Sequence, residues 1–434
     1  MDSLRIINSN DISEENLSKL IPRTKTELNS IRDSVNDIIN KVRLNGDKAL
    51  LKFTKEFDKI ELNKSEIQVP QQEIDEAYNQ IDQELLEALK YAKKNLIKFH
   101  KAQKREDWTI EIEEGVIAGQ IYRPLESVGI YIPGGRAIYP STVLMTSAPA
   151  YIAGVKHIIM CSPPQKDKKI APEILVAARE FEINNIFKVG GAQAIAAMAL
   201  GTETIPRVQK IVGPGNKWVN AAKQLLSGEV AIDTPAGPSE ILIIADDSAD
   251  YKFVILDFLS QIEHDPDNIG VIVSDSPKLI EDIKENLEFY VREAKREDII
   301  RTALKNNSLM IKAKDIEDCV RICNMIAPEH LEILTKDPKN LIDKINNAGA
   351  IFLGPYTPVP LGDYSAGTNH VLPTGGNASK YSGLNIYEFL KIIDILECDR
   401  VGLKSLSKSA STIAEFEKFY AHKKSIQERL KDKN

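Results

Sequence analysis

The chain has 434 residues, which is more than one hydrophobic core usually supports, so two or more packed units are expected. Its formal net charge is −7 and its basic residues are scattered, a distribution that argues against nucleic acid as a partner. No apolar run reaches the ~18 residues of a membrane span, and the first residues lack the features of a signal peptide. We therefore expect a cytoplasmic protein with no membrane partner, whose four dispersed cysteines are reduced thiols.

The first hundred residues are predicted to be mostly helical. Apolar residues recur at steps of three and four between Ile74 and Phe99, which is the pattern of a long amphipathic helix. His100 follows this stripe between Lys98 and Lys101, so we expect it to be a solvated surface histidine.

Beyond Gly115, short apolar runs alternate with stretches of helical length. This alternation predicts an α/β fold in which helices cover both faces of parallel sheets, extending to about residue 355. The predicted strands are residues 128–132, 157–161, 186–189, 241–245, 270–273, 309–311, 330–334 and 350–353.

Residues 354–383 are rich in Gly, Pro, Ser, Thr and Asn and show no periodicity. A long irregular segment within a compact fold usually carries function, so we expect a site loop here. Two later segments, residues 387–396 and 405–430, have helical spacing and are predicted to form a small terminal unit.

Gln261 and His264 lie near the end of a helix that is predicted to begin at about Ala249. Residues three apart share one helix face, and an amide oxygen and an imidazole can both bind zinc. The neighbouring acidic residues would favour a cation. Alternatively, His264 is only an electrostatic partner of the helix end, and this segment alone leaves both interpretations open.

Glu329 and His330 follow Pro328 and lead directly into a predicted strand. Adjacent strand residues face opposite sides, so one could lie in the core and the other in a cleft. Alternatively, both could lie at the strand mouth, where doubly wound folds bind ligands. Histidine is the commonest general base near neutral pH, and a glutamate can activate water. The non-catalytic alternative is a buried histidine whose hydrogen bonds are satisfied.

The segment from Gly362 to His370 combines a carboxylate, hydroxyl groups, an amide and an imidazole. Such polar density is costly to bury without a function. We therefore expect a site here, with Asp363 as a metal ligand and His370 as a residue that braces the loop.

Three glycine-rich turns could contact a cofactor, because helix N-termini with small residues accept phosphate or carboxylate groups. None has the pattern Gly-x-Gly-x-x-Gly, so ordinary turn geometry explains each of them equally well. The turns are residues 133–135, 190–193 and 213–216.

Six segments together resemble the histidinol dehydrogenases, and they occur in the order and spacing of that family. The resemblance extends over roughly residues 115–425. The segments are VGIYIPGG at 128–135, YPSTVLM at 139–145, GGAQAIA at 190–196, GPGN at 213–216, PAGPSE at 235–240 and GDYSAGTNH at 362–370.

This resemblance implies an enzyme that oxidises L-histidinol to L-histidine through L-histidinaldehyde, in the last steps of histidine biosynthesis. It implies two NAD molecules as oxidants and one zinc ion in each subunit. The acid–base pair of the family matches Glu329 and His330. The other matches are the zinc ligands Gln261, His264, Asp363 and His422, the substrate contacts Ser239 and Glu417 together with those ligands and His330, and the nucleotide contacts Tyr131, Gln193 and Asn216.

The resemblance also implies two doubly wound, incomplete Rossmann-like domains with helical extensions at both ends. Residues 1–24 would form the N-terminal extension. Residues 25–135 and 238–381 would form a first α/β domain with the site, and residues 136–237 a second domain with the nucleotide contacts. Residues 382–434 would form a small helical unit packed on the partner subunit of a homodimer, so that each site is shared.

One departure from the family lies near the C-terminus. Where the family commonly has Glu-Gly-Leu before a terminal Ala-His, this chain reads EKFYAH at residues 417–422, without the glycine. In a regular helix Glu417 and His422 would diverge by about 140°. Either the helix breaks between them or one of these two assignments fails.

Three alternatives to this function follow from the same residues. A related NAD-dependent dehydrogenase of another polyol or amino alcohol would use the same acid–base pair and nucleotide contacts. A zinc hydrolase is disfavoured, because neither His-Glu-x-x-His nor His-x-x-Glu-His occurs in the chain. A binding protein of two lobes would have no turnover at all.

Overall fold

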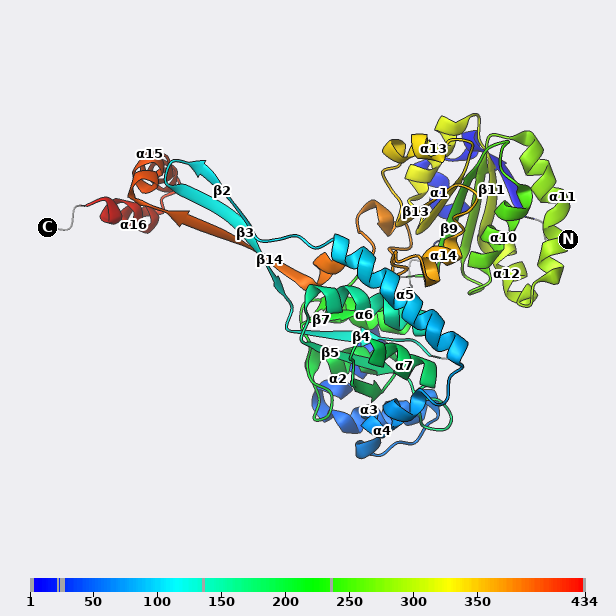
Figure 1. Cartoon of the computed structure of the whole chain (residues 1–434), viewed down its shortest axis with the longest axis horizontal. Helices are drawn as coiled ribbons and strands as arrows, with labels where there is room; N and C mark the ends of the chain where they lie inside the picture. The colour runs from blue at the N-terminus through cyan, green and yellow to red at the C-terminus, as the bar shows by residue number, and fades with distance from the viewer. Residues whose placement is uncertain (1–3, 22, 24–27, 135–136, 235–236, 432–434) are drawn as a thin grey trace.

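The computed structural model describes residues 4–21, 23, 28–134, 137–234 and 237–431. Two lobes and a long arm make up the molecule (Figure 1). Each lobe contains one parallel sheet with helices on both faces, so the predicted α/β fold is confirmed. Every strand predicted between residues 128 and 353 is present within a residue or two of its expected bounds.

The first lobe is built on a six-stranded parallel sheet with the order β1-β11-β10-β9-β12-β13. Helices α10 (Tyr251–Ile262), α11 (Pro277–Glu293) and α12 (Glu297–Asn307) bury apolar side chains on one face. Helices α1 (Glu14–Leu20) and α13 (Ile316–Ile326) cover the other face. In sheet order, the strands are Arg5–Asn8, Ser308–Lys312, Ile269–Ser274, Glu240–Ala245, His330–Leu334 and Ala350–Leu353.

The second lobe is built on a five-stranded parallel sheet with the order β6-β5-β4-β7-β8. The strands are Asn185–Lys188, His157–Ser162, Ser127–Tyr131, Lys210–Val212 and Ala231–Ile232. One face is covered by α4 (Gln71–Ala77), α5 (Gln83–Ala102), α6 (Pro140–Ala153) and α7 (Pro172–Glu180), and the other by α2 (Leu28–Asn45), α3 (Asp47–Phe53), α8 (Gly191–Leu200) and α9 (Lys217–Leu226).

Two N-terminal segments, the helices α2 to α5 and the strand β1, do not lie where the predicted domain boundaries put them. The prediction groups residues 25–135 with the first α/β domain, whereas helices α2 to α5 of this segment pack on the five-stranded sheet of the second lobe. Residues 1–24 are predicted to be helical, but β1 joins the edge of the six-stranded sheet by pairing with β11. A strand can form there because β11 leaves one edge of that sheet unpaired.

The arm is a three-stranded antiparallel sheet followed by two helices, α15 (Arg400–Phe416) and α16 (Tyr420–Leu430). Its strands are β2 (Trp108–Glu113), β3 (Val116–Pro124) and β14 (Leu390–Cys398). The helix predicted at residues 387–396 is therefore wrong. Short apolar runs fit either periodicity, and pairing with β3 along the whole of β14 decides for the strand.

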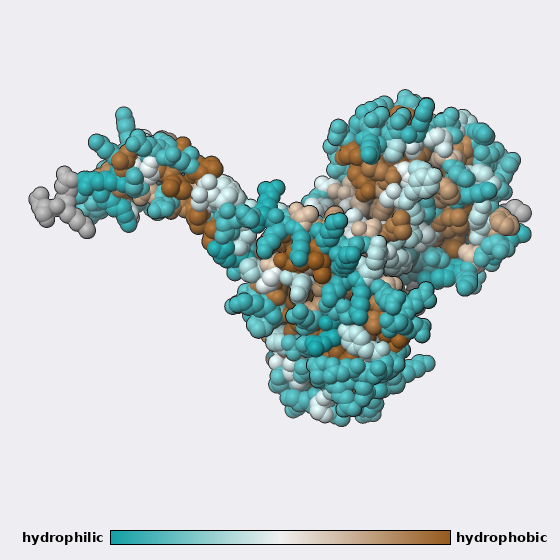
Figure 2. All heavy atoms as spheres, in the orientation of Figure 1, coloured by the Kyte–Doolittle hydropathy of each residue, from teal (hydrophilic) through white to brown (hydrophobic). Residues whose placement is uncertain are grey.

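Apolar side chains cover much of the arm and are exposed to solvent. Figure 2 shows hydrophobic surface along it. Isolated exposed apolar residues are ordinary, whereas many exposed apolar residues on one part of a molecule are typical of an interaction surface. The set comprises Trp108, Ile110, Ile112, Ile117, Ile392, Ile393, Ile395, Leu396, Val401, Leu406, Ile413, Phe416, Phe419 and Tyr420.

His100 corrects another prediction. Its side chain is fully buried rather than solvated, and its Nδ1 lies 3.0 Å from Oε1 of Gln103. Burial lowers the pKa of this imidazole.

Within the described part of the chain, no helix has both the length and the apolar character that crossing a bilayer requires.

Candidate active site

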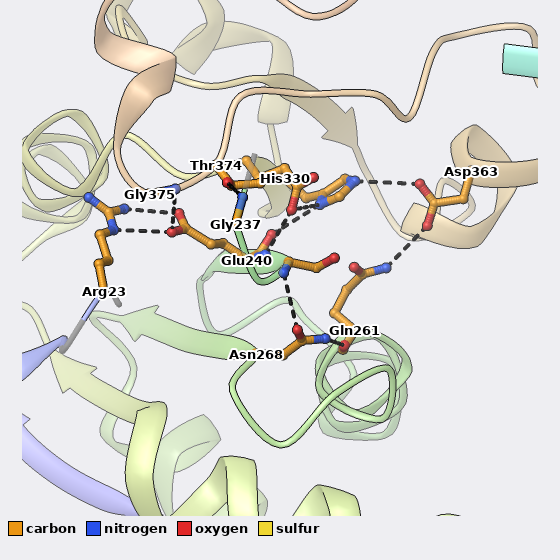
Figure 3. A network of polar contacts seen from close by, with 11 residues as sticks. Arg23, Gly237, Glu240, Gln261, Asn268, His330, Asp363, Thr374 and Gly375 are labelled. Atoms are coloured by element: carbon orange, nitrogen blue, oxygen red, sulfur yellow. Dashed lines mark hydrogen bonds and ion pairs between the residues drawn. The ribbon is translucent and has the colours of Figure 1, made fainter. Parts of the chain in front are cut away.

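His330 is the first residue of β12 and lies at the centre of a polar cluster (Figure 3). Its Nδ1 is 3.0 Å from the backbone oxygen of Glu240 and 3.5 Å from Oε2 of Glu329. Its Nε2 is 3.4 Å from Oδ1 of Asp363, a long ion-pair contact, and has no closer hydrogen-bond partner among the described residues. Since a backbone carbonyl can only accept, Nδ1 carries the proton in the neutral ring and Nε2 is free to accept one.

The cluster lies at the N-terminal end of β12, whereas ligands of doubly wound folds usually bind at the carboxyl ends of strands. The side chains of His330 and Glu329 are both buried, with 3% and 5% of their surface exposed. The structure therefore does not place one of them in the core and the other in an open cleft, which was the arrangement expected from alternation along a strand. Glu329 precedes the strand, and this lets its carboxylate turn back to accept a hydrogen bond from the backbone N–H of Glu240 at 2.8 Å.

The charges around His330 determine its protonation. Burial disfavours the imidazolium, but the carboxylates of Glu329 and Asp363 outweigh this effect and raise the pKa of His330 well above its usual value. Burial also acts against the ionised form of Asp363, but hydrogen bonding and charge from His330 lower the pKa of that carboxyl. These two shifts favour a protonated His330 beside the ionised carboxylate of Asp363.

Asp363 and Gln261 connect this cluster to a helix end. Asp363 lies in the short helix α14 (Val359–Tyr364), within the loop predicted to form a site. Its Oδ2 accepts a hydrogen bond from Nε2 of Gln261 at 3.2 Å. Gln261 is in the last turn of α10, and its backbone oxygen accepts a hydrogen bond from Asn268 at 2.7 Å. The loop and the helix thus place a carboxylate and an amide side by side.

The loop from Gly362 to His370 is anchored on the second lobe. Nδ1 of His370 lies 2.8 Å from the backbone oxygen of Asp363, and its Nε2 lies 3.3 Å from the hydroxyl of Thr142 in α6. Asn369 donates to the backbone oxygen of Met145 in α6 at 2.7 Å and lies 3.4 Å from the buried His100. These contacts fix Asp363 at the junction of the two lobes. His370 thus makes the contacts expected of a residue that braces the loop.

Of the predicted zinc ligands in the first lobe, Gln261 and Asp363 are in contact. His264 lies just beyond the end of α10, and its buried Nδ1 has no hydrogen-bond partner among the described residues. Among the described residues, no three His, Cys, Asp or Glu side chains are grouped to hold a metal. An amide oxygen, an imidazole and a carboxylate suit zinc in donor type, but a tetrahedral site needs a fourth ligand from elsewhere.

Glu417 directly follows α15 and His422 lies in α16, and Figure 1 shows these two helices at the end of the arm, away from both lobes. Both residues are exposed. The helix does break between them. Lys418 has a φ of 64°, and the N–H groups of Lys418 and Phe419 donate to the oxygens of Glu415 and Ala414 at 3.0 and 2.7 Å. This is the hydrogen-bonding pattern that ends a helix with a left-handed residue. Lys418, which stands where the family commonly has glycine, therefore adopts the left-handed conformation.

The predicted nucleotide residues lie at the carboxyl ends of strands in the second lobe: Tyr131 ends β4, Gln193 follows β6 and Asn216 follows β7. The hydroxyl of Tyr131 accepts a hydrogen bond from the backbone N–H of Gly191 at 3.0 Å, and burial raises the pKa of this phenol to about 12. Gln193 is 1% exposed, and its Oε1 has no partner. Asn216 caps α9 through the N–H groups of Trp218 and Val219. Of these three side chains, Gln193 is thus the one with a buried polar atom, Oε1, that has no partner among the described residues.

Glu332 is a buried carboxyl group on the same face of β12 as His330. The carboxyl of Asp257, in α10, lies against it. Burial, followed by the charge of Asp257, raises the pKa of Glu332 to about 10. Because two neighbouring carboxyl groups in a dry site do not both ionise, the pair holds one proton at neutral pH.

This raised pKa predicts how stability depends on pH. Between the ordinary value of 4.5 and about 10, the folded state binds a proton that the unfolded state has lost, so the free energy of unfolding decreases as pH rises. Glu332→Gln removes this titration. We expect its melting temperature relative to the wild type to rise by at least about 2 °C between pH 5 and pH 9. Thermal melts would measure this, with the exposed Glu106→Gln as a control that stays level; a constant difference for both variants would contradict it.

The sequence did not single out several residues that hold the cluster in place. Glu240 contacts both Glu329 and His330 through its backbone, and Ser239, a predicted substrate contact, directly precedes it. Asn268 connects the segment before β9 to the end of α10, because it accepts a hydrogen bond from the N–H of Ser239 at 3.1 Å and donates one to the backbone oxygen of Gln261. Arg23 pairs with Glu240 across 217 residues of sequence. The signal available for Glu240 was its position at the end of the segment PAGPSE.

Known proteins match the chain over nearly its whole length. The family model described as histidinol dehydrogenase matches residues 21–430. The histidinol dehydrogenase of Methanocaldococcus jannaschii is 47% identical over 97% of each chain, and that of Clostridium acetobutylicum is 44% identical over 99% of this chain and 100% of the relative. A crystal structure of histidinol dehydrogenase from Elizabethkingia anophelis is similar with a TM-score of 0.90 at 41% identity, over 92% of each chain. The chain therefore belongs to the histidinol dehydrogenase family and is an oxidoreductase.

Proposed function

We propose that this protein oxidises L-histidinol to L-histidine through L-histidinaldehyde, as the final steps of histidine biosynthesis. Overall, the carbinol carbon loses two hydrides, one to each of two NAD molecules, and gains one oxygen atom from water. The observation that carries this proposal is the position of His330, which lies between the carboxylate of Glu329 and the Asp363–Gln261 pair.

His330 is the base in this proposal. Its Nδ1 is held by the backbone oxygen of Glu240 and its Nε2 has no hydrogen-bond partner, so Nε2 takes the proton of the substrate hydroxyl as hydride leaves the adjacent carbon. Its raised pKa is caused by the negative charge of Glu329 and then by the carboxylate of Asp363. A cation bound to that carboxylate would reduce its effect on His330 and bring the imidazole closer to the neutral form that a base needs.

Glu329 has the second role, in the aldehyde step. Its carboxylate is fixed at 2.8 Å from the N–H of Glu240 and 3.5 Å from Nδ1 of His330. From this position it would accept a proton from the water that adds to the aldehyde carbon. The resulting hydrate again carries a hydroxyl whose proton His330 can take, and the second hydride transfer gives the carboxylate.

Gln261, His264 and Asp363, with His422 of the partner subunit, would hold the zinc ion. When bound, the ion would orient the imidazole and amino nitrogens of the substrate and so fix the carbinol carbon. Ser239 and Glu417 would add polar contacts to the same substrate. Tyr131, Gln193 and Asn216 would contact NAD, and the unpartnered Oε1 of the buried Gln193 supports this assignment.

The arm supports a homodimer with shared sites. Its exposed apolar side chains need a protein surface to cover them, and the three ligands proposed in the first lobe leave a tetrahedral zinc site one ligand short, which His422 would provide. Because a two-fold axis repeats every contact, each arm would complete the site of the other subunit. The left-handed Lys418 makes this possible, because the helix break changes the direction in which His422 projects relative to Glu417.

The proposed function predicts a stoichiometry and a metal requirement. We expect the purified protein to form two NADH per L-histidinol consumed, to contain about one zinc per subunit, and to lose turnover on prolonged chelation. Absorbance at the NADH band, product analysis and elemental analysis would measure these quantities. One NADH per substrate would favour the related alcohol dehydrogenase, and no NADH would contradict the proposal.

A further inference from the structure

Glu240 is a buried carboxylate outside the set of residues assigned to catalysis. It is the first residue of β9, only 2% exposed, and its side chain points away from His330 toward Arg23 (Figure 3). Nε and Nη2 of Arg23 donate to its two oxygens at 3.1 and 3.0 Å, and the backbone N–H of Gly375 donates to Oε1 at 2.8 Å. Both oxygens of this carboxylate are therefore satisfied by groups distant in sequence.

The backbone of the same residue holds the acid–base pair. The N–H of Glu240 donates to Oε2 of Glu329 at 2.8 Å, and its carbonyl oxygen lies 3.0 Å from Nδ1 of His330. One peptide segment thus fixes the carboxylate on one side and the ring tautomer on the other. Any rotation of the backbone at residue 240 would move both groups at once.

The ion pair can act as the anchor that prevents this rotation. Arg23 also donates to the backbone oxygen of Ile326, at the end of α13, so the guanidinium connects Glu240 to a second element of the lobe. A bidentate contact between guanidinium and carboxylate fixes orientation as well as distance. Breaking a buried pair by removing one partner leaves an uncompensated charge, so the site would rearrange to relieve it.

We propose that Glu240 and Arg23 are positioning residues for the reaction, because their ion pair fixes the backbone that orients Glu329 and His330. This inference rests on the proposed function, since it assigns no chemistry of its own. It differs from a purely structural role, in which the pair would contribute to stability and leave the geometry of catalysis unchanged.

The test is a comparison of Glu240→Gln and Arg23→Met with the wild type. We expect either change to lower kcat by about 10- to 100-fold, the cost of a small misplacement of reacting groups. KM for NAD and the zinc content should change by less than about twofold, because neither residue contacts the groups proposed to bind them. Arg23→Lys keeps the charge but cannot make the bidentate contact, so its kcat should lie between those of Arg23→Met and the wild type.

A double-mutant cycle distinguishes positioning from general destabilisation. If Glu240 acts through Glu329, the loss caused by Glu240→Gln should shrink in a Glu329→Gln background. The matched control is Lys93→Met, which breaks the 3.1 Å pair with Glu180 in the second lobe and should leave kcat unchanged. Thermal melts on every variant would detect unfolding.

The outcomes separate this inference from the proposed function. If the wild type turns over histidinol while Glu240→Gln and Arg23→Met retain its kcat, the positioning role is overturned and the function stands. Additive losses in the cycle would likewise overturn it. If the wild type itself forms no NADH, the proposed function has failed before any variant is compared.

Discussion

Replacing His330 with asparagine is expected to lower kcat for L-histidinol by about 10²- to 10⁴-fold, the usual contribution of a general base. Asparagine fills similar space and can still donate to the backbone oxygen of Glu240, but it offers no basic nitrogen where Nε2 of His330 lies. Steady-state formation of NADH measures the loss. Zinc content should not change, because His330 is not one of the proposed ligands.

A surface histidine provides the control for this variant. His157, at the start of β5, is exposed and distant from the cluster, so His157→Asn should leave kcat unchanged. If His330→Asn loses zinc along with turnover, its effect would come from the metal site, and the role of His330 as a base would lack support. Retention of full turnover would contradict that role directly.

Mixing two inactive variants is expected to restore activity if the site is shared between subunits. Asp363→Asn and His422→Ala should each abolish turnover as homodimers. In a heterodimer of the two, one site collects both lesions and the other collects none. Random pairing would therefore restore about a quarter of wild-type activity, because half of the dimers are mixed and each has one intact site.

Co-expression with two affinity tags would isolate the heterodimers for this measurement. The control is a mixture of Asp363→Asn with His330→Asn, two lesions that lie in the same lobe and 3.4 Å apart in the wild type. Each site of that heterodimer retains one lesion, so activity should not return. If the pair of Asp363→Asn and His422→Ala also stays inactive as an isolated heterodimer, His422 does not complete the site of a partner.

Local pattern was sufficient for much of the fold. Buried parallel strands are short, continuous apolar runs, and this is why the strands from residue 128 to residue 353 were predictable one by one. The polar loop around Asp363 and the Glu329–His330 pair were also recognisable from local sequence, because each combines reactive side chains with turn-forming residues. The roles of individual residues came from the resemblance to the family. His422 shows this most clearly, because one histidine in a charged C-terminal helix carries no local signal.

Local pattern failed where long-range contacts decide. His100 has lysines on both sides in the sequence, yet the packing of α5 against α6 and the loop buries it beside Asn369. Residues 390–398 satisfy helical spacing, but β3 provides an open edge and makes them a strand. In both cases the partner lies far along the chain, where no local periodicity can report it.

By itself, the sequence determined the buried strands between residues 128 and 353 and the chemical groups that are available, because backbone preference and apolar periodicity act over a few residues. Only the tertiary structure decided which of these groups meet. The order of strands in the first sheet places His330 beside Glu240, and the loop anchored on α6 brings Asp363 to Gln261. The pairing of Arg23 with Glu240 depends on the packing of the whole lobe, and so does the geometry of the acid–base pair.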